Sequence, residues 1–276
     1  MTAFEPPTAS GFPAMEAPEL FARHLADAVA AAGAVALAMF RSEIRSWNKH
    51  NDSPVTEADI AVDRFLKERL EALAPDYGWL SEESADSPDR LSRRRVWVVD
   101  PIDGTRAFMA GGEDWAVSAA LVEDGRPIAG ALFAPVTDEL FVAAKGRGAT
   151  RNGARIAASD RPSLDGATIS GPGFLLDRVA RTAAISRMPR VRSLALRLTR
   201  VATAELDLAL ASGNSHDWDL AAADLLVHEA GGALTGYDGT VLLYNAPVPR
   251  HGPLVCAGPY LHAPMLDLAR GELGAS

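Results

Sequence analysis

Hydrophobic residues in the first half of the chain follow first a helical and then a strand-like pattern. Residues 18–47 are rich in alanine and other apolar residues, and they predict a long core helix. Apolar residues recur at helical spacing in residues 56–73 and predict a second helix. Strands are expected at residues 77–80, 95–99, 115–122, 127–134 and 138–144. Their direct succession indicates an antiparallel sheet in this half.

The second half of the chain alternates between the two patterns. Strands are expected at residues 167–170, 206–210 and 254–257, and helices at residues 174–185, 194–204, 217–230 and 260–269. Gly231 and Gly232 follow the third of these helices, which is typical of a helix C-terminus. The change of pattern places a boundary near residues 150–165. We therefore expect a flexible tail at residues 1–15, an N-terminal α+β half at residues 16–155 and a C-terminal α/β half at residues 156–276.

Composition places the chain among ordinary globular proteins. Hydrophobic residues make up 48% of the 276 residues and charged residues 23%, which excludes a fully disordered chain. A net charge of −9 argues against a protein that coats a nucleic acid polymer. The single cysteine, Cys256, excludes a disulfide within the chain and favours a cytoplasmic location. The apolar run at residues 28–40 is shorter than the about 20 residues that span a bilayer, so no membrane partner is expected.

The sequence Asp-Pro-Ile-Asp-Gly-Thr occupies residues 100–105, directly after an apolar strand-like run. Pro101 biases Asp100 toward extended backbone, and Gly104 permits tight backbone geometry and the close approach of a ligand. Asp103 and the two residues after it have the pattern of a short helix start, whose N–H groups can hold an anion. On its own, an Asp-Gly pair is equally typical of a simple turn.

Further oxygen ligands near this motif favour a metal site over a simple turn. Glu82 follows another apolar strand-like run, and Asp219 opens a predicted helix. Carboxylates that converge in a buried site repel one another strongly unless a cation binds there. Asp100, Asp103 and the carbonyl of Ile102 offer the hard oxygen ligands that Mg²⁺ prefers.

Several known catalytic motifs are missing from the sequence. The haloacid-dehalogenase type requires Asp-x-Asp, whereas Asp100 and Asp103 have two residues between them. A cysteine phosphatase requires Cys-x5-Arg, but the position at that distance from Cys256 is His262. The sequence also contains no Walker loop, no Gly-x-Gly-x-x-Gly motif and no zinc spacing of its histidines.

With these residues in view, the chain resembles the inositol monophosphatase family of Mg²⁺-dependent, lithium-sensitive phosphatases. The motifs that carry the resemblance lie at residues 52–59, 81–84, 97–105 and 218–232. The similarity runs from Lys49 to Gly232 and more loosely to the C-terminus. The resemblance implies a layered α-β-α-β-α sandwich of α+β and α/β elements, and it implies a possible homodimer.

The resemblance also implies roles for individual residues. The positions that match the ligands of two or three Mg²⁺ ions are Glu82, Asp100, the Ile102 carbonyl, Asp103 and Asp219. Thr105, together with Glu82, matches the group that activates water, and Asp59 matches the acceptor that orients this threonine. The positions that match contacts to the phosphate and the substrate are Asp103, Gly104, Thr105 and Asp219.

The chain departs from the family at positions that bear on the substrate. Ser81 stands where the family often has glycine. Residues 208–216 contain no carboxylate, whereas inositol phosphatases usually carry a glutamate there. Arg197 stands where the nucleotidase branch often has lysine, and as a substrate contact it could bind a second phosphate. The alternative is a charge on the surface of the helix expected at residues 194–204.

We therefore expect Mg²⁺-dependent hydrolysis of a small phosphorylated metabolite, with inositol-1-phosphate or a similar sugar phosphate placed first. The alternatives are a 3′(2′),5′-bisphosphate nucleotidase, then a histidinol-phosphate phosphatase and, outside the enzymes, an inactive metabolite-binding regulator. Glu83 and Asp224 are expected in solvent or behind the metal ligands. The basic residues Arg90, Arg93, Arg94 and Arg95 predict a solvated loop, or a funnel for an anionic ligand.

Overall fold

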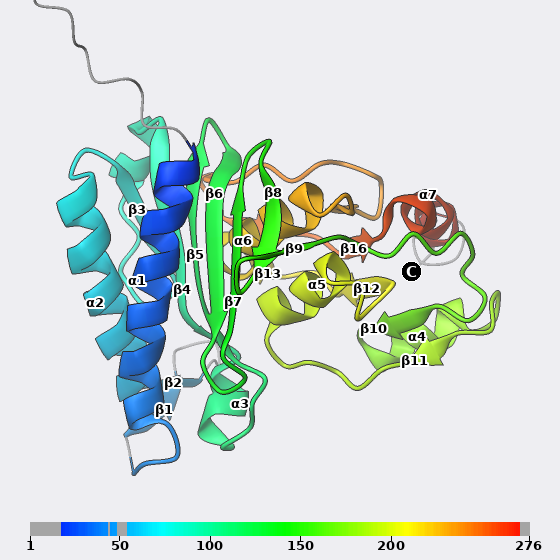
Figure 1. The fold of residues 1–276 in the computed structure, drawn as a ribbon, viewed down its shortest axis with the longest axis horizontal. Helices are drawn as coiled ribbons and strands as arrows, with labels where there is room; N and C mark the ends of the chain where they lie inside the picture. Colours follow the sequence, from blue (N-terminus) through cyan, green and yellow to red (C-terminus); the bar gives the residue numbers. More distant parts are fainter. Residues whose placement is uncertain (1–17, 44, 49–53, 271–276) are drawn as a thin grey trace, which may run out of the picture.

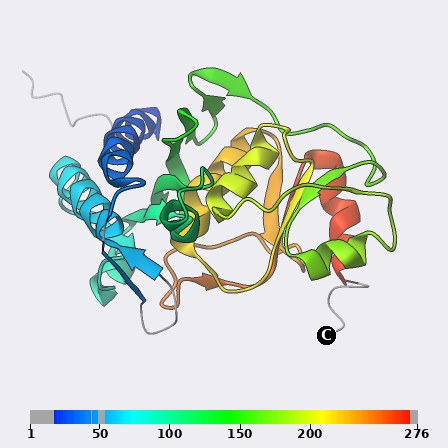
Figure 2. The same ribbon diagram turned by 90° about the horizontal axis from the view of Figure 1, so that it is seen from below.

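Helical and sheet layers alternate in an α-β-α-β-α sandwich (Figures 1 and 2), which confirms the predicted fold. The computed structural model describes residues 18–43, 45–48 and 54–270. The tail expected at residues 1–15, and the motif residues Lys49 and Asp52, lie outside the described residues.

Three pairs of helices form the helical layers. The outer helices on one side are α1 (Pro18–Met39) and α2 (Glu57–Leu73). The central helices, which lie between the two large sheets, are α5 (Leu194–Ala202) and α6 (Asp217–Glu229). The outer helices on the other side are α4 (Gly173–Val179) and α7 (Pro259–Leu268), as Figure 1 shows.

The larger sheet has the strand order β3-β4-β5-β6-β7-β8-β9. Its strands are β3 (Gly78–Ser81), β4 (Arg95–Asp103), β5 (Ala116–Glu123), β6 (Arg126–Ala134), β7 (Glu139–Ala144), β8 (Gly148–Arg151) and β9 (Ala154–Ile156). All neighbours are antiparallel except β3 and β4, which run parallel. The sequence predicted that this strand ends at residue 99, and that boundary is wrong. The pairing of β4 with β5 is irregular between Asp100 and Asp103 and resumes at Asp103.

The smaller sheet has the strand order β11-β10-β12-β16-β14. Its strands are β10 (Thr168–Ser170), β11 (Ser186–Arg187), β12 (Leu208–Ala211), β14 (Ala233–Gly236) and β16 (Leu254–Ala257). The helix expected at residues 174–185 ends earlier, at Val179. The chain after it forms β11, which pairs with β10. Gly231 follows α6 with a φ of 86°, which confirms the glycine-rich helix end predicted there.

The helix predicted for residues 18–47 ends at Met39, so its second boundary is wrong. Arg41 has a φ of 58°, which lies in the left-handed region and interrupts the helix. The chain then forms β1 (Ser46–Asn48), which pairs antiparallel with β2 (Pro54–Thr56). Ser46 and Trp47, which the local pattern assigned to the helix, therefore form a strand because they pair with β2.

Helix α1 is long and apolar enough to count as a candidate membrane span by length and composition. Phe21, Leu25 and Val29 on this helix have 0% exposure and belong to the hydrophobic core under the larger sheet. The ring of Phe21 packs edge-on against Trp97 of β4, with centroids 6.0 Å apart. This burial is the expected behaviour of a core helix.

Hydrophobic core lies on both faces of the larger sheet. Successive side chains of a strand alternate, so Trp97 faces α1 and α2, whereas Val98 faces the central helices. Leu254 of the smaller sheet belongs to the same buried cluster as Val98, so side chains from both parts of the chain share this cluster. The division of the chain near residues 150–165 stays a prediction.

Candidate active site

The end of β4 carries Asp100 beside the residue that follows β3. Strands β3 and β4 run parallel, and Ser81 pairs with Val99. The Glu82 amide donates a hydrogen bond to the Val99 carbonyl at 3.3 Å. Because the two strands point in the same direction, Glu82 and Asp100 follow paired residues and lie side by side at one edge of the sheet.

Gly104 makes the turn from β4 into the short helix α3 (Thr105–Met109). Its φ is 97°, and a Cβ at this position would lie 2.6 Å from the Asp114 carbonyl oxygen. Glycine meets both requirements because it has no side chain and adopts positive φ without strain. The turn places Thr105 at the first position of α3, where the sequence predicted a helix start.

Asp59, in the first turn of α2, contacts Thr105. One carboxylate oxygen, Oδ2, accepts from the amide and the hydroxyl of Thr56, at 2.8 Å and 2.6 Å. The other oxygen, Oδ1, accepts from the Thr105 hydroxyl at 3.2 Å. Burial raises the pKa of Asp59 to about 6, and the hydrogen bonds from Thr56 oppose this shift. The structure thus brings Thr105 together with the acceptor predicted for it.

Asp103 joins the end of β4 to the N-terminus of α5. Its carboxylate accepts from the Ala195 amide at 2.6 Å, from the Leu194 amide at 3.3 Å and from the hydroxyl of Ser193. These amides belong to the first turn of α5, which lacks partners within the helix. Burial raises the pKa of Asp103 to about 6, while the hydrogen bond from Ser193 and those from the amides lower it.

Asp219 reaches the same place from the first turn of α6. Its Oδ2 accepts from the His216 amide at 2.7 Å, which fixes the carboxylate at the start of the helix. Burial raises the pKa of Asp219 well above its usual range, and the nearby charge of Asp103 raises it further. The sequence prediction that Asp219 opens a helix is confirmed.

Asp100, Asp103 and Asp219 form a compact carboxylate cluster. One oxygen from each residue lies within 4.8 Å of an oxygen from each of the others. Burial raises the pKa of Asp100 well above its usual range, and the charge of Glu82 adds to this effect. Among the described residues, Oδ1 of Asp100 is buried and has no hydrogen-bond donor. Converging carboxylates that include this unpaired oxygen fit a hard divalent cation, which would supply positive charge.

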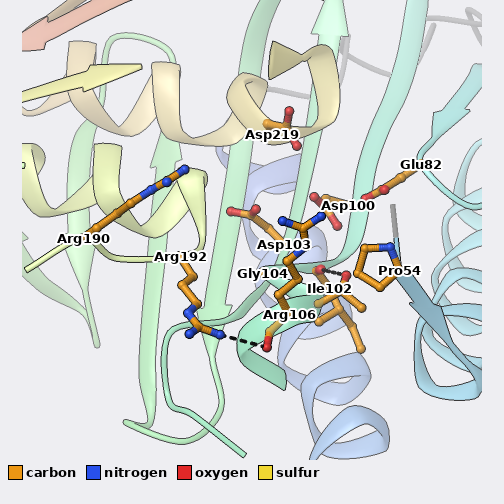
Figure 3. A pocket seen from close by; sticks show the side chains of 11 residues that line it. Pro54, Glu82, Asp100, Ile102, Asp103, Gly104, Arg106, Arg190, Arg192 and Asp219 are labelled. Atoms are coloured by element: carbon orange, nitrogen blue, oxygen red, sulfur yellow. Dashed lines mark hydrogen bonds between the residues drawn. The ribbon is translucent and has the colours of Figure 1, made fainter. Parts of the chain in front are cut away.

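The cluster opens into a cavity of about 620 Å³. The lining residues are Pro54, Glu82, Asp100, Ile102, Asp103, Gly104, Thr105, Arg106, Arg190, Arg192 and Asp219. Figure 3 shows the three aspartates together in the pocket, with Glu82 and Pro54 on one side and Arg190 and Arg192 on the other. A pocket with carboxylates on one side and arginines on the other can bind metal ions and an anion together.

The sequence analysis missed the three arginines of this pocket. Arg106 directly follows Thr105, and its carbonyl oxygen accepts from Nη1 of Arg192 at 3.2 Å. Arg190 and Arg192 precede α5, whose first turn meets Asp103. The sequence did not indicate that Arg190 and Arg192 line the pocket, because they lie far along the chain from the acidic motifs. The packing of α5 against the end of β4 brings them there.

Arg197, predicted as a substrate contact, does not line the described pocket. It is 3% exposed, so the alternative of a helix-surface charge is wrong. Its Nη1 donates to the Val191 carbonyl at 3.4 Å. Burial lowers the pKa of Arg197 to about 10. This cation is therefore part of the interior behind the pocket.

The basic cluster at residues 90–95 does not line the pocket, and its members differ in exposure. Arg90 is 2% exposed and forms an ion pair with Asp86 at 2.6 Å. Arg95 pairs with Glu123 at 2.7 Å. The buried pairing of Arg90 contradicts a solvated position for that residue, whereas Arg93 and Arg94 are exposed as predicted. None of the four arginines lines the pocket as a funnel would require.

Two acidic residues of the motifs have structural partners away from the cluster. Asp224 is 2% exposed and accepts from the Tyr244 hydroxyl at 2.9 Å, which contradicts a solvated position. Glu229 accepts from the amides of Gly146 at 2.6 Å and Gly148 at 2.7 Å. The glutamate near the end of α6 thus secures the turn between β7 and β8.

The layered fold and its pocket of converging carboxylates fit a metal-dependent phosphatase. A family model described as the inositol monophosphatase family matches residues 18–270. The chain belongs to the inositol monophosphatase family, whose members are metal-dependent phosphatases.

Individual relatives agree with this assignment. A histidinol-phosphatase of Mycobacterium tuberculosis is 35% identical over 237 residues, which cover 81% of this chain and 87% of the relative. An inositol-1-monophosphatase of Rhizobium meliloti is 34% identical over 194 residues, which cover 67% of this chain and 73% of the relative. The crystal structure of the extragenic suppressor protein SuhB from Bartonella henselae superimposes with a TM-score of 0.82 at 27% identity, covering 92% of this chain and 99% of that chain.

The names of the relatives indicate different substrates. Besides the two phosphatases above, a protein of Aggregatibacter actinomycetemcomitans named 3′(2′),5′-bisphosphate nucleotidase CysQ is 31% identical over 211 residues, which cover 71% of this chain and 77% of the relative. Similar identities thus accompany different substrate names, so the substrate must be argued from the pocket.

Proposed function

We propose that the chain hydrolyses a small phosphate monoester with the help of Mg²⁺ held at the carboxylate cluster. The ligands would be Glu82, Asp100, the Ile102 carbonyl, Asp103 and Asp219. The convergence of three aspartates within 4.8 Å, in a cavity that arginines also line, is the observation that carries the proposal. Two or three ions fit the family pattern, and bound Mg²⁺ supplies charge to neutralise phosphate oxygens and to lower the pKa of a water molecule.

Thr105 and Asp59 are proposed to hold the attacking water. The Thr105 hydroxyl lies 3.2 Å from Oδ1 of Asp59 and 3.1 Å from the Ile102 carbonyl oxygen, and its one hydrogen is proposed to go to Asp59 because a carboxylate is the stronger acceptor. Asp59, with a pKa of about 6, is ionised above this pH and then acts only as an acceptor. The lone pairs of Thr105 can therefore accept a hydrogen bond from water, with Glu82 as the second acceptor in the same pocket. The amides of Gly104 and Thr105 are proposed to hold the phosphate.

The basic side of the pocket favours a substrate whose leaving group carries a second anionic group. Arg106, Arg190 and Arg192 line the cavity, and all three side chains are exposed to solvent. Residues 208–216 supply no carboxylate for sugar hydroxyls. We therefore propose a bisphosphate nucleotide ahead of inositol-1-phosphate. Histidinol phosphate comes last, because its amine would carry a positive charge toward these arginines.

One screen tests the proposed function. Phosphate release is measured from a 3′,5′-bisphosphate nucleotide, inositol-1-phosphate, fructose bisphosphate and histidinol phosphate, each with Mg²⁺ and with EDTA. We expect Mg²⁺-dependent release with the highest kcat/KM for the bisphosphate nucleotide, and inhibition by lithium. Binding of these compounds without release from any of them would favour the inactive metabolite-binding regulator. A homodimer and a cytoplasmic location are proposed only by analogy with the family and from the single cysteine.

A further inference from the structure

Helix α2 carries two buried acidic residues on the face that contacts Thr105 and Ser81. Asp59 and Asp63 are one helical turn apart, so their side chains lie on the same side of the helix. Asp59 holds Thr105. Asp63 is 8% exposed and contacts Ser81, which is 4% exposed and immediately precedes Glu82.

The Asp63 carboxylate accepts one hydrogen bond from each side of the Glu82-Glu83 pair. Its Oδ1 accepts from the Ser81 hydroxyl, and its Oδ2 accepts from the Ser84 hydroxyl at 2.6 Å. The Ser81 oxygen in turn accepts from the Glu83 amide at 3.3 Å. Both ends of the turn that contains Glu82 are therefore tied to one carboxylate on a rigid helix.

This arrangement matters because β3 ends at Ser81, immediately before Glu82. The backbone hydrogen bond from Glu82 to Val99, at 3.3 Å, is long for an amide donor. It fixes the start of the turn at Glu82. The hydroxyls of Ser81 and Ser84 hold the backbone on either side of Glu82 and Glu83, since each donates to the same carboxylate.

We propose that Asp63 is a positioning residue for Glu82, in parallel with the role of Asp59 toward Thr105. Helix α2 thereby sets the relative placement of both groups that the proposed function assigns to the water, and the inference rests on that function. The serine at position 81, where the family often has glycine, supplies a hydroxyl that glycine lacks. Asp63 contacts neither substrate nor metal in this account and acts through the turn at residues 81–84.

The test compares variants of the turn with a matched control. Asp63→Ala removes the shared acceptor, and Ser84→Ala removes one of its donors. Ser159→Ala serves as the control, because the Ser159 hydroxyl donates to the buried Asp207 in the same manner but lies outside the pocket. For each protein, Mg²⁺ affinity is measured by calorimetry, kcat and KM by phosphate release, and the melting temperature in EDTA.

We expect Asp63→Ala to weaken Mg²⁺ binding about 10-fold to 100-fold, with a lower kcat and a nearly unchanged KM. Ser84→Ala should show a smaller change in the same direction, and Asp63→Asn should fall between the wild type and Asp63→Ala because its single amide oxygen can accept from only one of the two hydroxyls. Ser159→Ala should leave Mg²⁺ affinity unchanged. A purely structural role for Asp63 predicts a lower melting temperature and an unchanged Mg²⁺ affinity.

A double-mutant cycle with Glu82→Gln separates the inference from the function on which it rests. If Asp63 acts through Glu82, the effect of Asp63→Ala on Mg²⁺ affinity disappears in the Glu82→Gln background. Equal effects of Asp63→Ala in both backgrounds overturn the inference alone, as does an unchanged Mg²⁺ affinity in Asp63→Ala. An unchanged Mg²⁺ affinity in Glu82→Gln overturns the ligand assignment, and the inference with it.

Discussion

The hydroxyl of Thr105 lies 3.2 Å from Oδ1 of Asp59, although the two residues are 46 positions apart. Asp59 is itself held by the amide and hydroxyl of Thr56, which use its other oxygen. The start of α2 therefore fixes the Asp59 carboxylate. The Thr105 hydroxyl also lies 3.1 Å from the Ile102 carbonyl oxygen. Donation to the carboxylate, which is the stronger acceptor, leaves the oxygen of Thr105 as an acceptor at the wall of the pocket.

Replacing Thr105 should affect turnover far more than substrate binding. We expect Thr105→Ala to lower kcat about 10²-fold or more and to change KM little, because its hydroxyl acts on the water. The N-cap of α3 is Gly104, so a capping role for the Thr105 side chain is excluded. Thr105→Ser, which keeps the hydroxyl, is the control, and equal losses of kcat in the two variants would contradict the proposed role.

Asp103→Asn should remove a metal ligand while it keeps the fold. We expect a loss of at least about 10²-fold in kcat/KM, which corresponds to about 3 kcal/mol of transition-state stabilisation. The amide oxygen of asparagine can still accept from the first turn of α5, where Ala195 donates at 2.6 Å. Circular dichroism and melting temperature check the fold, and near-normal Mg²⁺-dependent turnover would remove Asp103 from the proposed ligands.

The metal-free protein should lose stability as the pH rises. Burial raises the pKa values of Asp59 and Asp103 to about 6, and those of Asp100 and Asp219 also rise. The folded protein then binds more protons than the unfolded chain between about pH 4 and pH 6, so the free energy of unfolding falls through this range as pH increases. The stability that these protonated carboxyl groups contribute is fully present below about pH 4, and the part from Asp59 and Asp103 is lost above about pH 6.

Thermal denaturation across this pH range measures the effect. In EDTA, we expect the melting temperature to decrease from about pH 5 to about pH 8. Mg²⁺ should raise it more at the higher pH, because the ligands are then ionised. A melting temperature in EDTA that is constant or that increases over this range would argue against buried carboxyl groups with raised pKa values.

Arg190 and Arg192 should determine preference for the leaving group. We expect the double variant Arg190→Ala/Arg192→Ala to raise KM for a bisphosphate nucleotide about tenfold, because charge-assisted hydrogen bonds are lost. Hydrolysis of inositol-1-phosphate should change little. Arg187→Ala is the control, since Arg187 pairs with Asp177 and does not line the pocket. Equal changes for both substrates would assign the arginines to the transferred phosphate instead.

The acidic part of the site was predictable from the sequence because its residues follow local structural signals. Asp100 and Glu82 each follow an apolar strand-like run, and Asp219 opens a helix. Gly104 was expected where the chain needed a tight turn, and its φ of 97° agrees. In each case the residue type reflects a requirement of its immediate neighbours along the chain.

The basic part of the site was not predictable in this way. Arg197 has the sequence position of a substrate contact, yet it is 3% exposed within the interior. Arg190 and Arg192 have no local motif, and they reach the pocket because α5 packs against Asp103. The hydroxyl bridges from Ser81 and Ser84 to Asp63 likewise depend on tertiary packing, as does the pairing of β1 with β2.

Phosphate release by the wild-type chain and by Asp100→Asn, each with Mg²⁺ and with EDTA, tests the central claim most directly. Oδ1 of Asp100 is buried and has no hydrogen-bond donor among the described residues, so its proposed role is to bind a metal ion. We predict that release requires Mg²⁺, stops in EDTA, and falls at least about 10²-fold in Asp100→Asn, while the variant melts as a folded protein. Undiminished release in EDTA, or wild-type rates from Asp100→Asn, would contradict the assignment of the carboxylate cluster as the metal site.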